Sequence, residues 1–218
     1  MKQRLMLQVL VVSLMLIWGA SSASALGLGS YYERGWGDGE IDYDYYYDDD
    51  DNDNIDIDTD HRTRAIGFVL DTNVAKDSLF NYRLNIAFDK IEIDGLRPDS
   101  DYEADGFKMD HTFGFGVLRN EYVRLWVGPQ INLSYYNEDN HYRPFNFDDD
   151  DLNMFGFGVG PAMGVNINVG PVVTFTITQG YKFTWLFGEN FNDDFYGHES
   201  QYYINFGMLF RINDIYQQ

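Results

Sequence analysis

The sequence has no cysteine, few prolines and a shortage of positive charge. Its 218 residues include 5 prolines, and 15 Lys and Arg stand against 35 Asp and Glu, giving a formal charge of −20 at pH 7. The absence of cysteine excludes a disulfide framework, a thiolate metal site and a cysteine nucleophile. The shortage of Lys and Arg disfavours nucleic acid as a partner, because phosphate binding needs a basic footprint.

Long apolar runs are also lacking, except at the N-terminus. Lys2 and Arg4 precede an apolar stretch at 5–18, which is followed by small residues that include Ala23 and Ala25. This order predicts a signal peptide over residues 1–25, cleaved after Ala25. An uncleaved anchor is the alternative, but the run is short for a span of about 20 residues. Losing two positive charges would change −20 to −22.

The rest of the chain alternates between apolar and polar side chains in segments of ten or more residues. The clearest segment places Phe175 and Trp185 on one parity and Thr176 and Lys182 on the other, and only Gln179 interrupts the apolar side. Such alternation is typical of β-strands with one apolar face. The same test predicts eight strands, at 26–36, 62–71, 79–92, 107–118, 123–135, 155–167, 173–187 and 202–213.

The predicted connections alternate between short and long. Short links fall at 72–78, 119–120 and 168–170. The long, acidic connections are expected to be extracellular loops, at 37–61, 93–106, 137–151 and 188–199. This asymmetry is typical of outer-membrane barrels, and an even strand count places both termini in the periplasm. We therefore expect one all-β domain over 26–218, an eight-stranded antiparallel up-and-down transmembrane β-barrel.

A soluble, lipocalin-like barrel is the alternative reading of the alternation. Such a barrel turns its apolar face inward and a charged face to water. Here the polar face is mostly Gly, Thr, Asn and Ala, which suits a crowded lumen, and the large aromatics would not fit a narrow interior. Five aromatics lie toward the long-loop ends, as an interfacial girdle requires: Trp36, Tyr135, Trp185, Phe187 and Tyr202.

Two prolines lie inside predicted strands. Pro129 and Pro161 each end a Val-Gly-Pro triplet within an otherwise regular alternation. Proline cannot donate a hydrogen bond to the ladder. We expect bulges or locally broken pairing at both positions.

These features together resemble the small outer-membrane barrel families typified by OmpX and the transmembrane domain of OmpA. The resemblance covers the whole of 26–218 and implies a monomer in contact with outer-membrane lipid, lipopolysaccharide and the barrel-assembly machinery. Those families usually end on an aromatic residue that the assembly machinery reads. Here Phe210 is followed by a tail to Gln218, so an internal signal or Tyr216 would have to serve.

Eight charged residues share the lumen-facing parity. We expect Arg83, Arg124 and Arg211 in the periplasmic half of the barrel and the others nearer the loops, with Glu33 between the two groups. The others are Asp89, Lys108, Asp110 and Lys182. Buried charges must be paired, so a salt-bridge network filling the lumen is predicted. An ion path is the functional alternative, although eight strands usually leave a filled interior.

The segment from Asp38 to Asp60 contains twelve Asp and Glu residues and no Lys or Arg. Asp56, Asp58 and Asp60 resemble the start of an EF-hand loop, but His61 and Gly67 stand where that motif needs glycine and glutamate. Loose Ca²⁺ or Mg²⁺ binding that bridges to lipopolysaccharide phosphates is the hypothesis. A solvated loop is the alternative.

His198 and Ser200 are the weak catalytic candidates. Two residues apart in a strand, they point the same way and could act as base and nucleophile. They resemble the His-x-Ser of the lipid A 3-O-deacylase barrels, but Gln201 replaces the Asn of that family and no downstream Glu follows to orient the histidine. The other histidines, His61, His111 and His141, have no metal-ligand spacing.

The leading prediction is thus a non-enzymatic outer-membrane barrel protein whose acidic loops contact cations, lipopolysaccharide or an external partner. A narrow porin-like channel is the second reading, and a lipid A-modifying enzyme is the third.

Overall fold

The computed structural model describes residues 26–44, 54–72, 79–94, 102–138, 152–190 and 193–212. They form the strands β1 (Gly27–Asp44), β2 (Asn54–Asp71), β3 (Phe80–Asp94), β4 (Tyr102–Arg119), β5 (Val123–Glu138), β6 (Leu152–Val169), β7 (Val173–Asn190) and β8 (Asp193–Arg211). The predicted signal peptide, His141 and Tyr216 lie outside the described residues. Among the described residues, no helix is long and apolar enough to cross a membrane.

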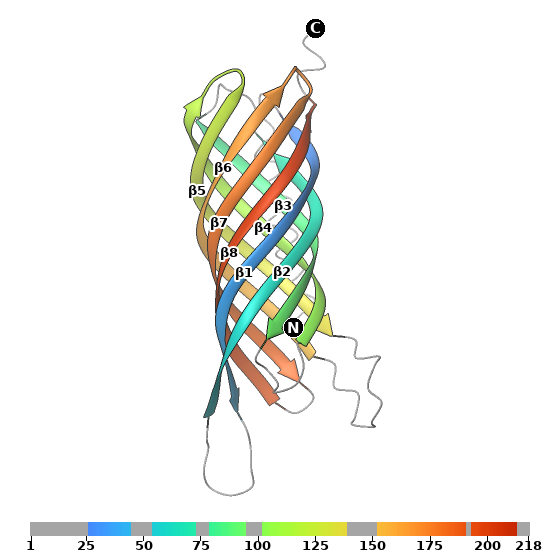
Figure 1. The fold of residues 1–218 in the computed structure, drawn as a ribbon, viewed down its shortest axis with the longest axis vertical. Helices are drawn as coiled ribbons and strands as arrows, with labels where there is room; N and C mark the ends of the chain where they lie inside the picture. The colour runs from blue at the N-terminus through green and yellow to red at the C-terminus, as the bar shows by residue number, and fades with distance from the viewer. Residues whose placement is uncertain are drawn as a thin grey trace, which may run out of the picture.

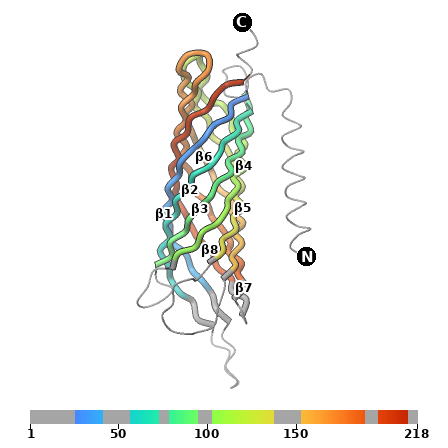
Figure 2. The backbone as a smooth tube through the Cα atoms, turned by 90° about the vertical axis from the view of Figure 1, so that its right-hand side faces the viewer, coloured from blue at the N-terminus to red at the C-terminus, as the bar shows by residue number. Residues whose placement is uncertain are grey.

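The strands form a closed barrel in which each strand pairs with its neighbours in sequence and β1 pairs with β8 (Figure 1). All eight pairings are antiparallel. A second view, turned by 90°, shows the same tube of tilted strands (Figure 2). The predicted eight-stranded antiparallel up-and-down barrel is confirmed.

The outward face of the barrel is apolar over most of its length. Ile66, Phe68 and Phe88 are 65%, 69% and 74% exposed, and all five predicted girdle aromatics also face outward. The interior instead holds mainly small, polar and charged side chains, together with a few buried aromatics such as Trp126 and Tyr203. A soluble barrel would bury its apolar face. The lipocalin-like alternative therefore does not fit.

The two prolines interrupt pairing without shifting the register. Pro129 and Pro161 lie opposite each other on β5 and β6. The β4–β5 ladder is broken beside Pro129, and the β6–β7 ladder is broken beside Pro161. At each break the proline has no N–H to donate to that neighbouring strand, β4 or β7. Locally broken pairing is thus present, but the register shift in these strands lies elsewhere, between Gly116 and Leu118 of β4.

On the side away from the short turns, the strands extend beyond the ends that we predicted for them. β1 continues to Asp44 and β2 begins at Asn54, while β7 and β8 are separated only by residues 191–192. Parts of all four ranges predicted as loops therefore belong to strands: 37–61, 93–106, 137–151 and 188–199. The prediction was wrong there because the outward side chains become charged, so an apolar face ends before the ladder does.

These strand extensions form what we call the distal section: residues 37–44, 54–61, 91–94, 102–106, 136–138, 152–154, 186–190 and 193–199. The remaining strand residues form the proximal section. On β1–β4 the distal section turns acids outward: Asp38, Glu40, Asp58, Asp60, Glu92, Asp94, Glu103 and Asp105. Its interior includes an apolar cluster of Ile41, Ile91, Ile93, Ala104, Tyr136, Met154 and Leu186.

Two of the proximal turns have clear local causes. The Asn120 side chain accepts hydrogen bonds from the backbone N–H groups of Tyr122 and Val123, at 2.9 and 2.7 Å, and so closes the β4–β5 turn. Gly170, at φ 66°, makes the left-handed step of the β6–β7 turn, a conformation that glycine adopts without strain.

Candidate functional site

The middle of the lumen contains a cluster of five charged side chains, which we call the central cluster: Glu33, Asp89, Lys108, Asp110 and Lys182. Glu33 lies between two lysines, with its Oε1 2.6 Å from Lys108 Nζ and 3.3 Å from Lys182 Nζ. Lys108 also lies 3.6 Å from Asp89, and Lys182 lies 3.7 Å from Asp110. Glu33 thus belongs to this group rather than between two groups, because both lysines reach it.

Neutral partners complete the central cluster. Asp110 accepts hydrogen bonds from Gln130 and Asn132, both at 2.8 Å, and Asp89 accepts one from Tyr136 at 2.8 Å. Buried charges are tolerated when paired and hydrogen-bonded in this way. The cluster therefore fills the lumen with three acids and two lysines in mutual contact, although one carboxylate oxygen each of Asp89 and Asp110 has no hydrogen-bond partner among the described residues.

A second group, the proximal cluster, centres on Arg83. Its guanidinium donates to Asp71 from both Nε, at 3.1 Å, and Nη2, at 2.8 Å. Further donations reach Thr178 at 2.8 Å and Asn166 at 2.9 Å, and the charge lies 5.0 Å from the centroid of the Trp126 ring. All three guanidinium nitrogens thus donate hydrogen bonds, and four of the five N–H groups are used.

Two other predicted lumen arginines lie on the same side of the central cluster. Arg124 donates to Asn81 at 3.4 Å, and Arg211 donates to the backbone carbonyl of Gly170 at the β6–β7 turn. Among the described residues, the buried acids Glu33, Asp71, Asp89, Asp110 and Glu199 match five buried Lys and Arg in number. A lumen balanced in this way has no net charge to select an ion.

A third polar group lies in the lumen of the distal section. His61 donates from Nδ1 to Glu199 at 2.6 Å, which leaves Nε2 to accept from the Thr59 hydroxyl at 2.6 Å. Burial opposes ionisation of Glu199, but the hydrogen bond from His61 and the positive charge of Lys182 outweigh it, so the pKa of Glu199 lies below its usual value. The order hydroxyl, imidazole, carboxylate matches a hydrolase triad. All three side chains are buried, which closes them to a substrate.

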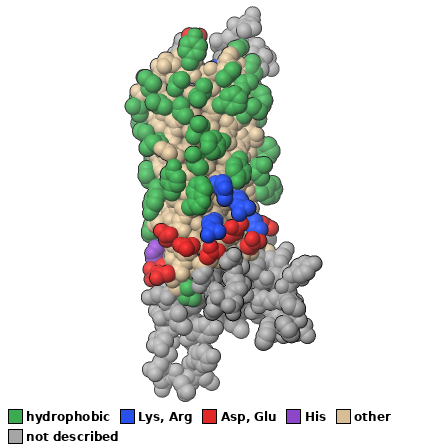
Figure 3. All heavy atoms as spheres, in the orientation of Figure 1, with side chains coloured by type: hydrophobic (Ala, Val, Ile, Leu, Met, Phe, Trp, Pro, Cys, Tyr) green, Lys and Arg blue, Asp and Glu red, His purple; other side chains and the backbone are tan. Residues whose placement is uncertain are grey.

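Two acids of the predicted cation site, Asp58 and Asp60, belong to an outward-facing ladder on β1 and β2. Asp38 lies opposite Asp60, Glu40 lies opposite Asp58, and at the backbone Asp42 lies opposite Asp56. Figure 3 shows this end of the barrel as a belt of acidic side chains below the apolar surface. Like charges directly across two strands repel each other. Within the described residues, no three His, Cys, Asp or Glu side chains are grouped closely enough to hold a metal ion.

The catalytic candidates are not joined in the structure. His198 Nε2 lies 3.8 Å from Glu40 Oε2 on the neighbouring strand, and both side chains are partly exposed. Ser200 lies opposite Phe183, and within the described residues no hydrogen bond links it to His198. A base and nucleophile need such a contact. His198 therefore has an acid beside it, supplied by β1, but no positioned hydroxyl.

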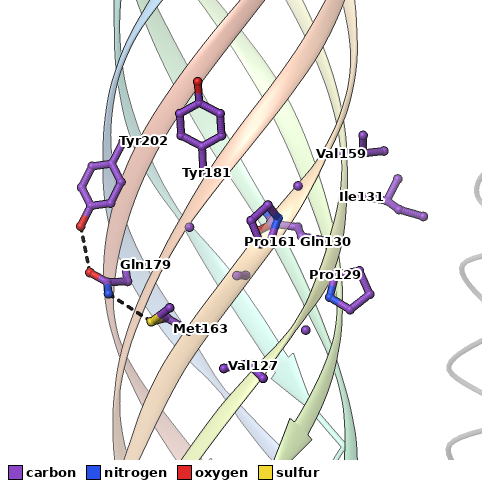
Figure 4. Close-up of a pocket in the computed structure, with 14 residues that line it drawn as sticks. Val127, Pro129, Gln130, Ile131, Val159, Pro161, Met163, Gln179, Tyr181 and Tyr202 are labelled. Atoms are coloured by element: carbon purple, nitrogen blue, oxygen red, sulfur yellow. Dashed lines mark hydrogen bonds between the residues drawn. The ribbon is translucent and has the colours of Figure 1, made fainter.

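A groove of about 770 Å³ runs over the outward face of β5, β6 and β7 (Figure 4). The floor of the groove consists largely of small residues, the glycines and both strand prolines. Gln179, the polar residue on this apolar face, is satisfied by the Tyr202 hydroxyl at 2.9 Å and by Met163 Sδ at 3.3 Å. Apart from such amide and hydroxyl groups, the lining of the groove is apolar. The groove is therefore better suited to binding a hydrocarbon chain than to catalysing a reaction.

Sequence reasoning missed three participants in these groups. Asp71, the partner of Arg83, is the last residue of β2, and we had not assigned it to the lumen. His61 and Glu199 are 138 positions apart, so only barrel closure brings them together. Parity was a usable signal for all three, because Asp71 and His61 share it with Ala65, and Glu199 shares it with Asn205. The contact between His61 and Glu199 has no such signal.

Comparison with known proteins gave matches of fold only. No protein-family model and no curated protein matches the chain. Among solved structures, the outer membrane protein OprG from Pseudomonas aeruginosa is 12% identical, with a TM-score of 0.48 over 84% of this chain and 96% of that one. The outer membrane protease OmpT from Escherichia coli is 8% identical, with a TM-score of 0.43 over 88% and 98%. Neisserial surface protein A is 12% identical, with a TM-score of 0.33 over 81% and 95%.

Proposed function

We propose that this chain is a non-enzymatic integral outer-membrane β-barrel protein, with the distal section outside the cell and both termini in the periplasm. The observation that carries the proposal is the outward apolar surface of the proximal section, which includes side chains more than 60% exposed on β2 and β3. In water, such a surface would drive aggregation. In a bilayer it is the expected lipid contact.

Strand length supports the same proposal. Strands of 18 residues, such as β1, exceed the 9–11 residues that a tilted strand needs to cross a membrane. The excess matches the distal section, whose outward acids suit water. The strands would therefore cross the bilayer and project beyond it.

Expression of the full chain in a Gram-negative bacterium tests this location. We expect the protein in the outer-membrane fraction, resistant to carbonate extraction, and faster on a gel before heating than after. Recovery as a soluble periplasmic protein would overturn the proposal.

The filled lumen favours a closed barrel over the narrow-channel alternative. Trp126, Arg83, Arg124, Tyr203 and Lys108 are the largest fully buried side chains, and all point inward. We expect no conductance steps from the purified protein in a planar bilayer. Discrete, reproducible steps would instead establish a channel.

We further propose that the acidic ladder attracts divalent cations diffusely and so helps to bridge the protein to lipopolysaccharide phosphates. The supporting observation is the repulsion between Asp38 and Asp60 and between Glu40 and Asp58, which a cation would relieve. Calorimetric titration with Ca²⁺ should give heat that falls in Asp58→Asn/Asp60→Asn. Equal heat from both proteins would remove the cation role.

A further inference from the structure

Four outward-facing basic side chains lie together where the apolar surface meets the acidic belt. We call Arg34, Arg62, Arg64 and Lys90 the basic row. Arg34 lies opposite Arg64 across β1 and β2, and Arg64 lies opposite Lys90 across β2 and β3. In Figure 3 this group of Lys and Arg side chains separates the apolar surface from the acidic side chains. Three neighbouring strands thus present positive charge at one level of the register.

The basic row is confined to one side of the barrel. Within the described residues of β5–β8, the Lys and Arg side chains are Arg124, Lys182 and Arg211, and all three are buried in the lumen. The remaining basic residue at the end of β4, Arg119, is exposed at the opposite end of the barrel, opposite Arg124 and beside the short turn. A general preference of the interface for basic residues would have spread them around the barrel. The asymmetry indicates a localised partner.

The surroundings of the basic row call for an anion. Side chains directly opposite each other on paired strands are about 4.5–5.5 Å apart at Cβ, and like charges there destabilise the pair. Toward the proximal turns, the next outward-facing residues along β2 and β3 are Ile66 and Phe88, and both side chains are strongly exposed. Positive charge beside a lipid-facing surface is costly unless it is neutralised.

The acids of the distal section neutralise this charge only in part. Arg64 lies 3.0 Å from Glu92 and Arg62 lies 3.1 Å from Asp94, each through Nη2 alone, and Lys90 Nζ donates to Glu103 at 2.5 Å. The side chains of Arg64 and Arg62 remain 52% and 54% exposed, and within the described residues Nε and Nη1 of both make no hydrogen bond. Arg34 lies 5.5 Å from the centroid of the Trp36 ring. Donors suited to a phosphate therefore remain available.

We propose that the basic row binds the phosphorylated headgroup of a glycolipid in the outer leaflet, an inference that rests on the proposed outer-membrane location. The arginine fork matches phosphate oxygens geometrically, and such charge-assisted hydrogen bonds are strong. Trp36 is an aromatic of the type that lies at the headgroup level. Position supports a lipid over a free anion, because the acyl chains would lie on Ile66 and Phe88 while the phosphate meets the arginines.

Native mass spectrometry of the protein purified from outer membranes tests the proposal. The probes are diphosphorylated lipid A, the same lipid after removal of both phosphates, inorganic phosphate and a glutamate-rich peptide. The variant is Arg34→Gln/Arg64→Gln/Lys90→Gln, and the matched control is Arg119→Gln, which removes an exposed arginine at the other end of the barrel. We expect wild type and control to bind diphosphorylated lipid A at least tenfold more tightly than the dephosphorylated lipid. The triple variant should lose that preference.

Equal binding of the two lipids by wild type would overturn the proposal without reference to any variant, so a misfolded variant cannot rescue it. A preference that survives in the folded triple variant would overturn it too. Competition by inorganic phosphate at equal concentration, or tighter binding of the acidic peptide, would identify a different ligand. Absence of the wild-type protein from the outer membrane would instead remove the proposed function, which separates the two failures.

Discussion

The proximal and distal sections are built from the same eight strands, but on β1–β4 their outward faces have opposite polarity. In the proximal section, apolar side chains such as Phe68 face outward, and charged groups such as Glu33 lie inside. In the distal section, acids such as Asp60 face outward, and apolar groups such as Ile91 lie inside. The strand ladders continue through the change. The polarity of each face therefore follows the proposed surrounding medium, lipid or water, rather than the fold.

The largest effect should come from the interior of the proximal section. Glu33→Gln removes the charge between Lys108 and Lys182 and leaves two buried lysines without their shared partner. Breaking a buried ion pair costs about 3–5 kcal/mol. We expect a loss of that size in the free energy of unfolding, measured by urea titration in vesicles.

The comparison variant is Glu33→Gln/Lys182→Met, which also leaves Asp110 without its lysine, whereas in the single variant each lysine keeps one acid. It should be less stable than the single variant, because it leaves a buried carboxylate unpaired. A loss below about 1 kcal/mol in the single variant would mean that the lumen is wetter than the structure indicates.

A smaller effect should distinguish the two outer faces. Phe68→Arg places a charge on the lipid-facing surface and should cost up to about 2–4 kcal/mol, depending on its depth in the bilayer. Asp60→Arg, on the same strand and face but in the distal section, should change stability by less than about 1 kcal/mol. Vesicle-based unfolding measures both. Similar costs at the two positions would contradict the boundary drawn between the sections.

The smallest effect concerns the polar group inside the distal section. Because the folded pKa of Glu199 is lowered, its pairing with His61 stabilises the protein above the ordinary glutamate pKa of about 4.3. That stability is lost as the pH falls through the lower folded value. The denaturation midpoints of wild type and Glu199→Gln should thus differ at pH 7 and converge toward pH 3. A difference independent of pH would exclude ionisation as its source.

Most of the fold could be predicted from alternation alone. The eight strands and their facing follow from runs such as 173–187, because a strand between lipid and lumen must alternate. The strand ends could not be predicted, because Asp38 and Glu40 continue the outward parity with charge in place of apolar surface. Arg34 interrupts the apolar parity of β1 for a related reason, since it belongs to the basic row rather than to an apolar face.

The candidate site could be predicted as far as parity along a strand determines whether a side chain faces the lumen. All eight residues assigned to the lumen are buried there, because inward parity at a charged residue allows no other environment in this barrel. Which of them pair depends on register, and register depends on strand ends. Contacts such as Lys182 with Glu33, 149 positions apart, therefore needed the three-dimensional structure.

The seam between β1 and β8 also bears on how this barrel is assembled. It joins Gly27 to Arg211 and continues to Tyr43 opposite Phe195, so its partners come from opposite ends of the sequence. Pairing residues so distant costs loop-closure entropy before any hydrogen bond offsets it. The seam is thus the natural last step of folding. Until it forms, two long strand edges remain open to pairing with other chains, and this is the interval in which an assembly factor would be most needed.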